Sequence, residues 1–392
     1  MNEKQIRYAV HVIVALSLFV VCGVLVLGLI DGRLRPGGAD ARAAGAGGEA
    51  AGGGAAAGSR GSFGSDASTV HGLALLSSDG RRLLIVDPAT GDARASRELP
   101  RQATSITATP GGVSVWVTFA DHAEIEVYDT RELELETVVQ VPGGAGRTPE
   151  HLTFSDTGEV LFITWSGSDV ISAYTHRMRE LSLRGEYDAA GTTGPVVRNR
   201  RATRVFRRDA DGGFGVFFAQ NGQRMGTIGQ PEGGLPSDGA NPGAVAAGFD
   251  GRYEYLLVGA GADQEAQVID ERDGSVRLLG AVHVSPVVRP VALSEASSEI
   301  AALTADRQRV VVVDAADAAV VREFDLSEVA AGLYVGRGGE LIVVSDSGSL
   351  FRIDPDGSGQ VERIADVSQL GGQAVAQVEG FTIQPQGTFA CF

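Results

Sequence analysis

Apolar residues in this chain recur in short alternating runs of four to six positions, and nearly the same phrase returns along the sequence. LLIVDPATGDARASREL (residues 83–99) is echoed by VVVVDAADAAVVREFDL (residues 310–326). Each phrase is typical of a strand, a turn that opens on Asp, and a second strand. Asp suits such a turn because its carboxylate accepts backbone N–H groups, and Gly suits it because it adopts positive φ without steric cost.

The turn position recurs seven times, at intervals of 40–49 residues. The seven turn positions are Asp87, Asp129, Thr175, Asn221, Asp270, Asp314 and Asp354. A second phrase of strand, Gly turn and strand precedes most of them, as at residues 151–165. Four short strands per unit of about 45 residues predict an all-β, seven-bladed β-propeller of four-stranded blades over residues 70–392.

The two ends of the repeat region predict ring closure. The first unit, from residue 72, contains three strands, and an unmatched segment, EGFTIQPQGTFACF (residues 379–392), follows the last unit. An open ring would leave two unpaired sheet edges. We therefore expect residues 379–392 to supply the strand that the first blade lacks.

The turns IVDPATG and VIDERDG and the phrase SDTGEVLFIT resemble the YVTN-repeat β-propellers of bacterial envelopes, and more loosely the WD-like and amine-dehydrogenase-type propellers. The resemblance covers residues 70–392 and implies the propeller fold. It leaves the function open, because propellers serve in binding, in scaffolding and as several kinds of enzyme.

The first 69 residues have a different pattern. Residues 8–30 carry no formal charge, and as a helix they would extend ~35 Å, enough to span a bilayer. We expect a short cytoplasmic tail (1–7), one uncleaved transmembrane helix (8–30) and a flexible Gly/Ala-rich linker (31–69). A tail this short favours a propeller on the extracytoplasmic (periplasmic) side of the cytoplasmic membrane.

Charge and cysteine content narrow the classes of function. The formal net charge of −16 disfavours nucleic acid as a partner, because phosphate binding requires clustered positive charge. The two cysteines, Cys22 and Cys391, lie near the two chain ends and predict no disulfide inside the propeller.

One basic segment, RNRRATRVFRR (residues 198–208), stands out in this acidic chain. Guanidinium groups bind carboxylates and phosphates through paired hydrogen bonds, so the segment is a candidate site for an anion or an acidic partner. The alternative is a solvated strand that balances nearby acids. The candidate residues are Arg198, Arg200, Arg201, Arg204, Arg207 and Arg208.

No other motif predicts a site strongly. DPDGSG at Asp354 is a hairpin turn rather than a calcium loop, and Trp116 and Trp165 occupy equivalent strands of the core. A ring could bring His122, His151 and His176 from adjacent blades together, but we predict no metal, cofactor or catalytic residue.

The sequence therefore favours a membrane-tethered propeller that binds a protein or an envelope polymer. The alternatives are a lactonase-like or quinoprotein-like propeller enzyme and a structural subunit of a membrane complex.

Overall fold

The chain divides into two units, Met1–Gly61 and Ser62–Phe392, and the computed structural model describes part of the second. The described residues are 70–382 except 156, 178, 199–203, 210–213, 229–244, 250–253, 261–264, 271–276, 284–287, 289, 294–298, 315–318, 357–358 and 368–372.

These residues form 28 strands, which are arranged in seven four-stranded sheets. In the sheet order found, the strands are β28 (Val375–Phe381), β1 (Gly72–Ser77), β2 (Arg82–Val86) and β3 (Ala93–Glu98); β4 (Ala103–Ala108), β5 (Ser114–Phe119), β6 (Glu124–Asp129) and β7 (Leu135–Gln140); β8 (Pro149–Phe154), β9 (Val160–Trp165), β10 (Val170–Arg177) and β11 (Glu180–Asp188); β12 (Thr192–Arg198), β13 (Arg204–Asp209), β14 (Phe214–Phe218) and β15 (Arg224–Ile228); β16 (Val245–Phe249), β17 (Glu254–Ala260), β18 (Glu265–Asp270) and β19 (Arg277–His283); β20 (Val291–Ala292), β21 (Glu299–Leu303), β22 (Arg309–Asp314) and β23 (Ala319–Asp325); β24 (Ala330–Val335), β25 (Leu341–Ser345), β26 (Ser349–Ile353) and β27 (Val361–Asp366).

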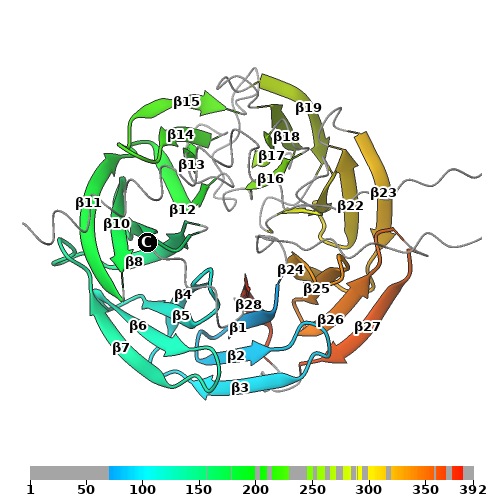
Figure 1. Cartoon of the computed structure of the whole chain (residues 1–392), viewed down its shortest axis with the longest axis horizontal. Helices are drawn as coiled ribbons and strands as arrows, with labels where there is room; N and C mark the ends of the chain where they lie inside the picture. Colours follow the sequence, from blue (N-terminus) through cyan, green and yellow to red (C-terminus); the bar gives the residue numbers. More distant parts are fainter. Residues whose placement is uncertain are drawn as a thin grey trace, which may run out of the picture. The chain divides into compact units, whose positions relative to one another are not determined.

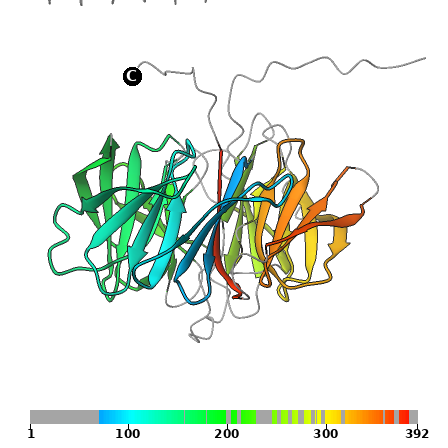
Figure 2. The same ribbon diagram turned by 90° about the horizontal axis from the view of Figure 1, so that it is seen from below.

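The sheets are the blades of a β-propeller, which confirms the predicted all-β fold with four-stranded blades. Figure 1 shows them around a centre, and Figure 2 shows the same blades from the side. The innermost strands contact those of neighbouring blades: β28 meets β4, β4 meets β8, β8 meets β12, β16 meets β20, β20 meets β24, and β24 meets β28.

Burial follows the place of a strand within its blade. Every residue of β1 and of β5 is buried, because these strands have a packed blade on each face. The outermost strand β3 alternates between half-buried and exposed residues, which suits a sheet edge that faces water. Trp116 and Trp165 lie fully buried in β5 and β9 within one apolar cluster, as predicted for core residues.

The C-terminal strand pairs with the first blade, but it begins earlier than predicted. β28 is antiparallel to β1, with Gly72 opposite Phe381. The prediction placed the strand in residues 379–392; β28 begins at Val375 and includes Glu379, Gly380 and Phe381 of that range, whereas residues 383–392 lie outside the described residues. The apolar pattern of β28 is broken at Gln377 because this side chain binds the neighbouring blade instead of packing in the core.

Polar side chains join the inner strands of adjacent blades. Gln377 accepts the N–H of Ile106 at 3.0 Å and donates to its carbonyl at 2.9 Å, which fastens β28 to β4. Thr153 donates to the carbonyl of Val196 at 2.7 Å between β8 and β12, and Tyr334 donates to the carbonyl of Val378 at 2.7 Å. Such bonds contribute about 1 kcal/mol each and also satisfy backbone groups at the sheet edge.

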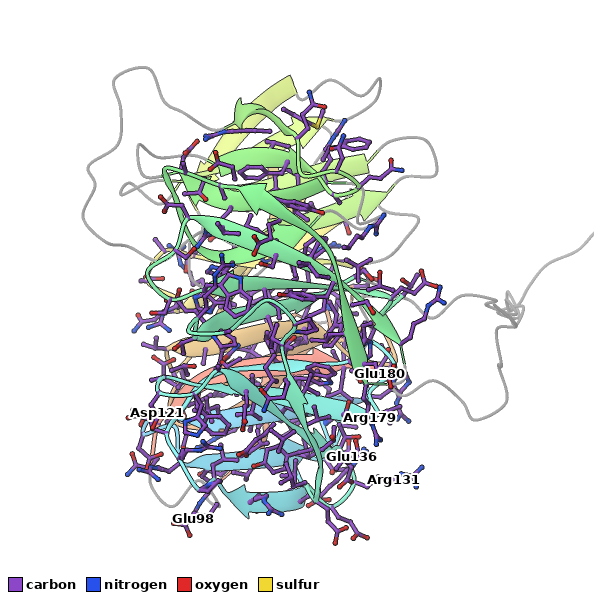
Figure 3. All side chains as sticks on the ribbon, turned by 90° about the vertical axis from the view of Figure 1, so that its left-hand side faces the viewer. Glu98, Asp121, Arg131, Glu136, Arg179 and Glu180 are labelled. Atoms are coloured by element: carbon purple, nitrogen blue, oxygen red, sulfur yellow. The ribbon has the colours of Figure 1, made fainter. Side chains whose placement is uncertain are left out.

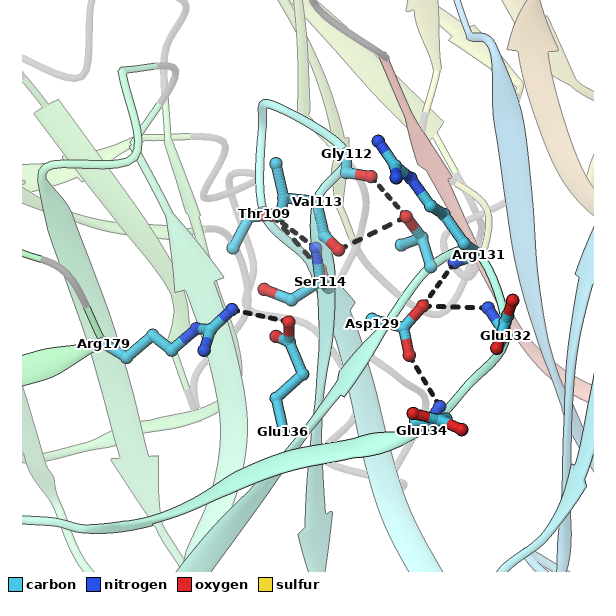
Figure 4. Close-up of polar contacts among 11 residues, drawn as sticks. Thr109, Gly112, Val113, Ser114, Asp129, Arg131, Glu132, Glu134, Glu136 and Arg179 are labelled. Atoms are coloured by element: carbon cyan, nitrogen blue, oxygen red, sulfur yellow. Dashed lines mark hydrogen bonds and ion pairs between the residues drawn. The ribbon is translucent and has the colours of Figure 1, made fainter.

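Four of the predicted turn residues, Asp87, Asp129, Asn221 and Asp354, form the expected hydrogen bonds. Asp129 follows this rule most fully (Figure 4), because its carboxylate accepts the N–H groups of Arg131, Glu132 and Glu134 at 2.7–2.8 Å. Burial raises the pKa of Asp129, but the three donors outweigh burial and the net pKa is lowered.

Asp87, Asn221 and Asp354 each accept the N–H two residues on, at 2.9–3.1 Å. Thr175 is an exception and that prediction is wrong. It lies inside β10, opposite Ser182 of β11, because these two strands are longer and their turn falls near Arg179. Arg179 also forms an ion pair of 2.5 Å with Glu136, which links the β10–β11 turn to the outer strand β7 on the face shown in Figure 3.

The predicted tail, membrane-spanning segment and linker (residues 1–69) lie outside the described residues. In the described part of the chain, no helix is long and apolar enough to cross a membrane.

Candidate functional site

The arginine-rich segment lies on the first two strands of one blade. Arg198 ends β12, Arg204, Arg207 and Arg208 belong to β13, and Arg200 and Arg201 lie outside the described residues. Successive residues of a strand point to opposite faces of the sheet, so residues an odd number of positions apart lie on different faces. The two described side chains, Arg204 and Arg207, are three positions apart, so they lie on opposite faces of the blade rather than in one patch.

Arg207 lies on the face that packs against the preceding blade. Val205 and Phe217 on this face form one apolar cluster with Phe162 and Tyr187 of the β8–β11 sheet. Only 3% of Arg207 is exposed. The two blades therefore hold a guanidinium group between them.

A bulge in β12 provides one partner for this group. The pairing of β12 with β13 shifts register between Thr193 and Val197, which leaves Gly194 outside the ladder. The Gly194 carbonyl accepts a hydrogen bond of 2.9 Å from Nε of Arg207. Gly194 has φ of 79°, a conformation that a glycine adopts at little cost and other residues avoid.

The remaining donors of Arg207 are less well matched. Among the described residues, its buried Nη1 has no hydrogen-bond partner. Two other arginines, both more exposed, have a close carboxylate within their own blade: Arg224 reaches Asp209 at 2.6 Å, and Arg101 reaches Glu126 at 2.6 Å. Since a buried cation without a close counter-charge costs several kcal/mol, Arg207 is the least compensated of the three.

The charged neighbours of Arg207 come from the β8–β11 blade. Glu150 and His151 stand near the start of the inner strand β8, and Asp169 lies in the loop between β9 and β10. Burial lowers the pKa of Arg207 more than the attraction of Glu150 and Asp169 raises it. The two carboxylates therefore do not fully offset the cost of burying this cation.

His151 is the titratable group beside this arginine. Its Nε2 lies 4.0 Å from the Oε1 of Glu150. Burial lowers the pKa of His151, Glu150 raises it, and Arg207 lowers it, with a net decrease. His151 is therefore neutral near pH 7, and Arg207 is the cation of the group.

This arrangement suits binding of an anion rather than proton transfer. An arginine keeps its proton at any physiological pH and has only donors to offer. The Gly194 carbonyl holds the guanidinium in one orientation, with Nη1 buried and without a hydrogen-bond partner among the described residues. A carboxylate or phosphate oxygen is the natural partner of such a group.

The three histidines considered for a metal site have separate environments. His176 packs edge-on against Trp116 at 5.2 Å between ring centres, and its Nδ1 contacts the Gly158 carbonyl at 2.9 Å. His122 lies 3.4 Å from the carboxylate of Asp121. Across the described residues, no group of three His, Cys, Asp or Glu side chains could hold a metal ion.

Sequence reasoning found Arg207, considered His151 only with His122 and His176 as a possible metal site, and missed Glu150 and Asp169. Glu150, His151 and Asp169 are isolated polar residues with no motif around them. The sequence offers one signal. The inner strand β8 has the titratable residues Glu150 and His151 near its start, whereas the equivalent strand β4 begins with the uncharged Ala103 and Thr104.

Comparison with known proteins establishes the fold. No protein-family model matches the chain, and no curated protein matches it. Many solved structures are similar. A putative 6-phosphogluconolactonase from Bacteroides fragilis superposes with a TM-score of 0.56 at 13% identity, over 80% of this chain and 99% of that one.

Two further structures give the same result. The dihydro-heme d1 dehydrogenase NirN has a TM-score of 0.54 at 14% identity, over 83% of this chain and 77% of its own. A protein of unknown function from Desulfotomaculum acetoxidans has a TM-score of 0.52 at 14% identity, over 78% and 99%. At these identities the similarity shows a shared β-propeller fold and no more.

Proposed function

We propose that this chain is a membrane-anchored β-propeller that binds a protein or an envelope polymer on the extracytoplasmic side of the cytoplasmic membrane. The anchor is the uncharged segment at residues 8–30, and the linker up to residue 69 tethers the domain. The seven sheets form a complete ring in this proposal, with β28 as the closing strand.

The observation that carries the binding role is the buried Arg207 at the contact between two inner strands. A fold that needs only packing would fill this position with an apolar side chain, since replacing buried charges by apolar groups is often neutral or stabilising. A guanidinium kept at this blade contact, beside the part-exposed side chains of Glu150 and His151, instead supports a role beyond packing.

The partner is tested by crosslinking in intact cells, followed by purification of the full-length chain in detergent. Arg207→Lys keeps the positive charge and removes the fork of donors. We expect this variant to lose a co-purifying protein or polymer that the unmodified chain retains. The matched control is Arg309→Lys. Arg309 lies in a different blade from Arg207, where it forms an exposed ion pair of 3.0 Å with Glu323 of the same blade.

Retention of every partner by Arg207→Lys would refute the binding role of this site. A stoichiometric metal or cofactor in the purified chain, measured by elemental analysis and absorbance, would favour a propeller enzyme instead.

The anchor and its orientation need separate measurements. We expect the chain to stay with membranes after alkaline carbonate extraction, and the propeller to be digested by protease added to spheroplasts. Release by carbonate, or protection until the cells are lysed, would contradict this part of the proposal.

A further inference from the structure

We propose that the contact between β8 and β12 is an acid-sensitive joint, in which a proton taken up by His151 places a second cation beside the buried Arg207 and loosens the two blades. This inference goes beyond the proposed binding role and does not depend on it. It is carried by the face of β8 on which His151 lies, by the burial of Arg207 and by the solvent exposure of the histidine ring.

His151 lies on the face of β8 that is turned towards β12, the adjacent inner strand (Figure 1). Leu152 packs in one apolar cluster with Trp116 of the preceding blade. Its two neighbours in the strand, His151 and Thr153, therefore lie on the opposite face. Thr153 confirms this direction, because its hydroxyl donates to the Val196 carbonyl of β12 at 2.7 Å.

Arg207 faces β8 from the next blade. It lies two residues after Val205 on β13, and Val205 shares an apolar cluster with Phe162 of the β8–β11 sheet. Arg207 is 3% exposed, and its Nε donates to the Gly194 carbonyl of β12 at 2.9 Å. The guanidinium and the imidazole of His151 are therefore on facing sides of one contact, and the charge of Arg207 acts on the histidine.

Two carboxylates lie beside these groups. Oε1 of Glu150, the residue before His151 on β8, is 4.0 Å from Nε2 of the ring, and its charge favours the protonated histidine. Asp169, in the loop between β9 and β10, acts on Arg207. Neither carboxylate forms an ion pair as short as the 2.6 Å pairs of Arg101 and Arg224, so added positive charge at this contact is poorly compensated.

The other strands packed against this contact present uncharged groups. Thr164 of β9 is the pairing partner of His151 in the sheet. On the side of the preceding blade, the Thr118 hydroxyl of β5 reaches the Glu150 carbonyl at 3.4 Å. Hydroxyl groups do not neutralise a cation, so the charge on His151 is set by Glu150 and Arg207.

Acid therefore weakens the joint. Burial and the charge of Arg207 lower the pKa of His151, and together they outweigh Glu150. The unfolded chain takes up this proton at about pH 6.5, and the folded chain takes it up at a lower pH. The stability that the contact contributes is thus complete above about pH 6.5 and is lost as pH falls through the folded value. The ring is 29% exposed, so protons reach it from solvent.

Amide hydrogen exchange of the full-length chain in detergent, followed by mass spectrometry at about pH 7.5 and about pH 5.5, tests the joint. Each rate is corrected for the intrinsic pH dependence of exchange. We expect residues 149–154 and 192–198 to lose protection at the lower pH by more than about twofold, up to the limit of about tenfold that an unfolded pKa of about 6.5 allows.

The variants separate His151 from other titrating groups. His151→Gln should keep its protection at the lower pH. The matched control is His122→Gln, because His122 is 40% exposed in another blade, and this variant should lose protection as the unmodified chain does. Glu150→Gln removes the charge that favours protonation and should increase the loss, whereas Arg207→Gln removes the charge that opposes it and should decrease the loss.

Each outcome decides the inference. Equal protection of the unmodified chain at the two pH values overturns it, and so does a loss that His151→Gln retains. A smaller loss in Glu150→Gln, or a larger one in Arg207→Gln, overturns the assignment of these charges. If His151→Gln or Arg207→Gln does not fold at about pH 7.5, judged by circular dichroism, the sign of the change in Glu150→Gln still decides.

The binding role fails separately, because exchange is measured without a partner. A partner that Arg207→Lys loses in cells, together with protection that does not depend on pH, would keep the binding role and reject the acid-sensitive joint. Retention of every partner, together with the expected pH dependence, would keep the joint and reject the binding role.

Discussion

Closure of the first blade depends on the contact between Gly72 and Phe381. These residues are opposite each other in the pairing of β1 with β28. The Phe381 ring covers the glycine, and a Cβ added to Gly72 would lie 2.3 Å from Cζ and 2.5 Å from Cε2 of that ring. An aromatic residue that covers a glycine on the partner strand is a known way to stabilise a sheet at such a position.

We expect Gly72→Ala to destabilise the protein. A normal contact needs at least 3.4 Å, so the ring must move by about 1 Å, and Phe381 is only 3% exposed. Overpacking of a core costs about 1–3 kcal/mol, whereas the lower chain entropy of alanine in the unfolded state returns about 0.4–1 kcal/mol. The net loss of about 1–2 kcal/mol corresponds to a decrease in Tm of roughly 2–8 °C.

Thermal unfolding of the full chain, followed by the fluorescence of the buried Trp116 and Trp165, measures this change. The control is the same substitution in a Phe381→Ala background, which alone should cost about 3–5 kcal/mol. Without the ring there is no obstacle, so Gly72→Ala should then be neutral or slightly stabilising. If Gly72→Ala costs as much in that background as in the unmodified chain, the explanation by the ring is wrong.

Three further predictions concern polar contacts of the described blades. Glu126→Gln should lower the free energy of unfolding by about 1.5–3 kcal/mol in denaturant titrations, because the buried Glu126 carboxylate accepts hydrogen bonds from Arg101 and Tyr128. Asp129→Ala should lower it by about 1–2 kcal/mol, because three turn N–H groups lose their acceptor. Asp129→Asn should cost less, because its one amide oxygen can still accept the two N–H groups that Oδ1 accepts and only the bond to Oδ2 is lost. The hydrogen bond from Ser347, followed by those from two other serines, lowers the pKa of Glu328, and its contribution to stability is therefore complete above the unfolded value of about 4.3 and is lost as pH falls through the lower folded value. Between pH 6 and pH 2, the free energy of unfolding, measured by denaturant titrations followed by fluorescence, should accordingly decrease less steeply for Glu328→Gln than for the unmodified chain. The same decrease in both proteins would show that the three serines do not stabilise the charge.

Local pattern was sufficient to predict the blades. The turn residues Asp87, Asp129, Asn221 and Asp354 accept hydrogen bonds from N–H groups no more than five residues away in the sequence. Both partners of each bond are therefore visible in a short stretch of the chain. Such local bonds make both the strand boundaries and the repeat length readable from one chain.

Features that depend on a neighbouring blade were predicted less well. The closing strand was placed too late because Gln377 interrupts its apolar pattern, and the reason for that residue is a peptide group of another blade. The turn at Thr175 was misplaced because β10 and β11 are longer than the other outer pairs, a property that spacing alone does not reveal.

The candidate site shows the same division more sharply. The sequence marked six arginines as one group, because they are close in the chain and share a charge. The structure separates the two described side chains by the alternation of β13, so that Arg204 and Arg207 have different neighbours although they are three residues apart.

What distinguishes Arg207 is the bulge at Gly194, a local break in β12 that gives one donor a carbonyl and leaves Nη1 without a partner among the described residues. Its charged neighbours come from another blade, at Glu150 and Asp169. The number of basic residues in a segment does not show this, because the energetic cost of a buried charge depends on the charges and hydrogen-bond partners within a few ångströms of it. Substitution of Arg207 alone should therefore affect partner binding more than substitution of Arg204 alone, and equal effects would show that summed charge, rather than one placed guanidinium, attracts the partner.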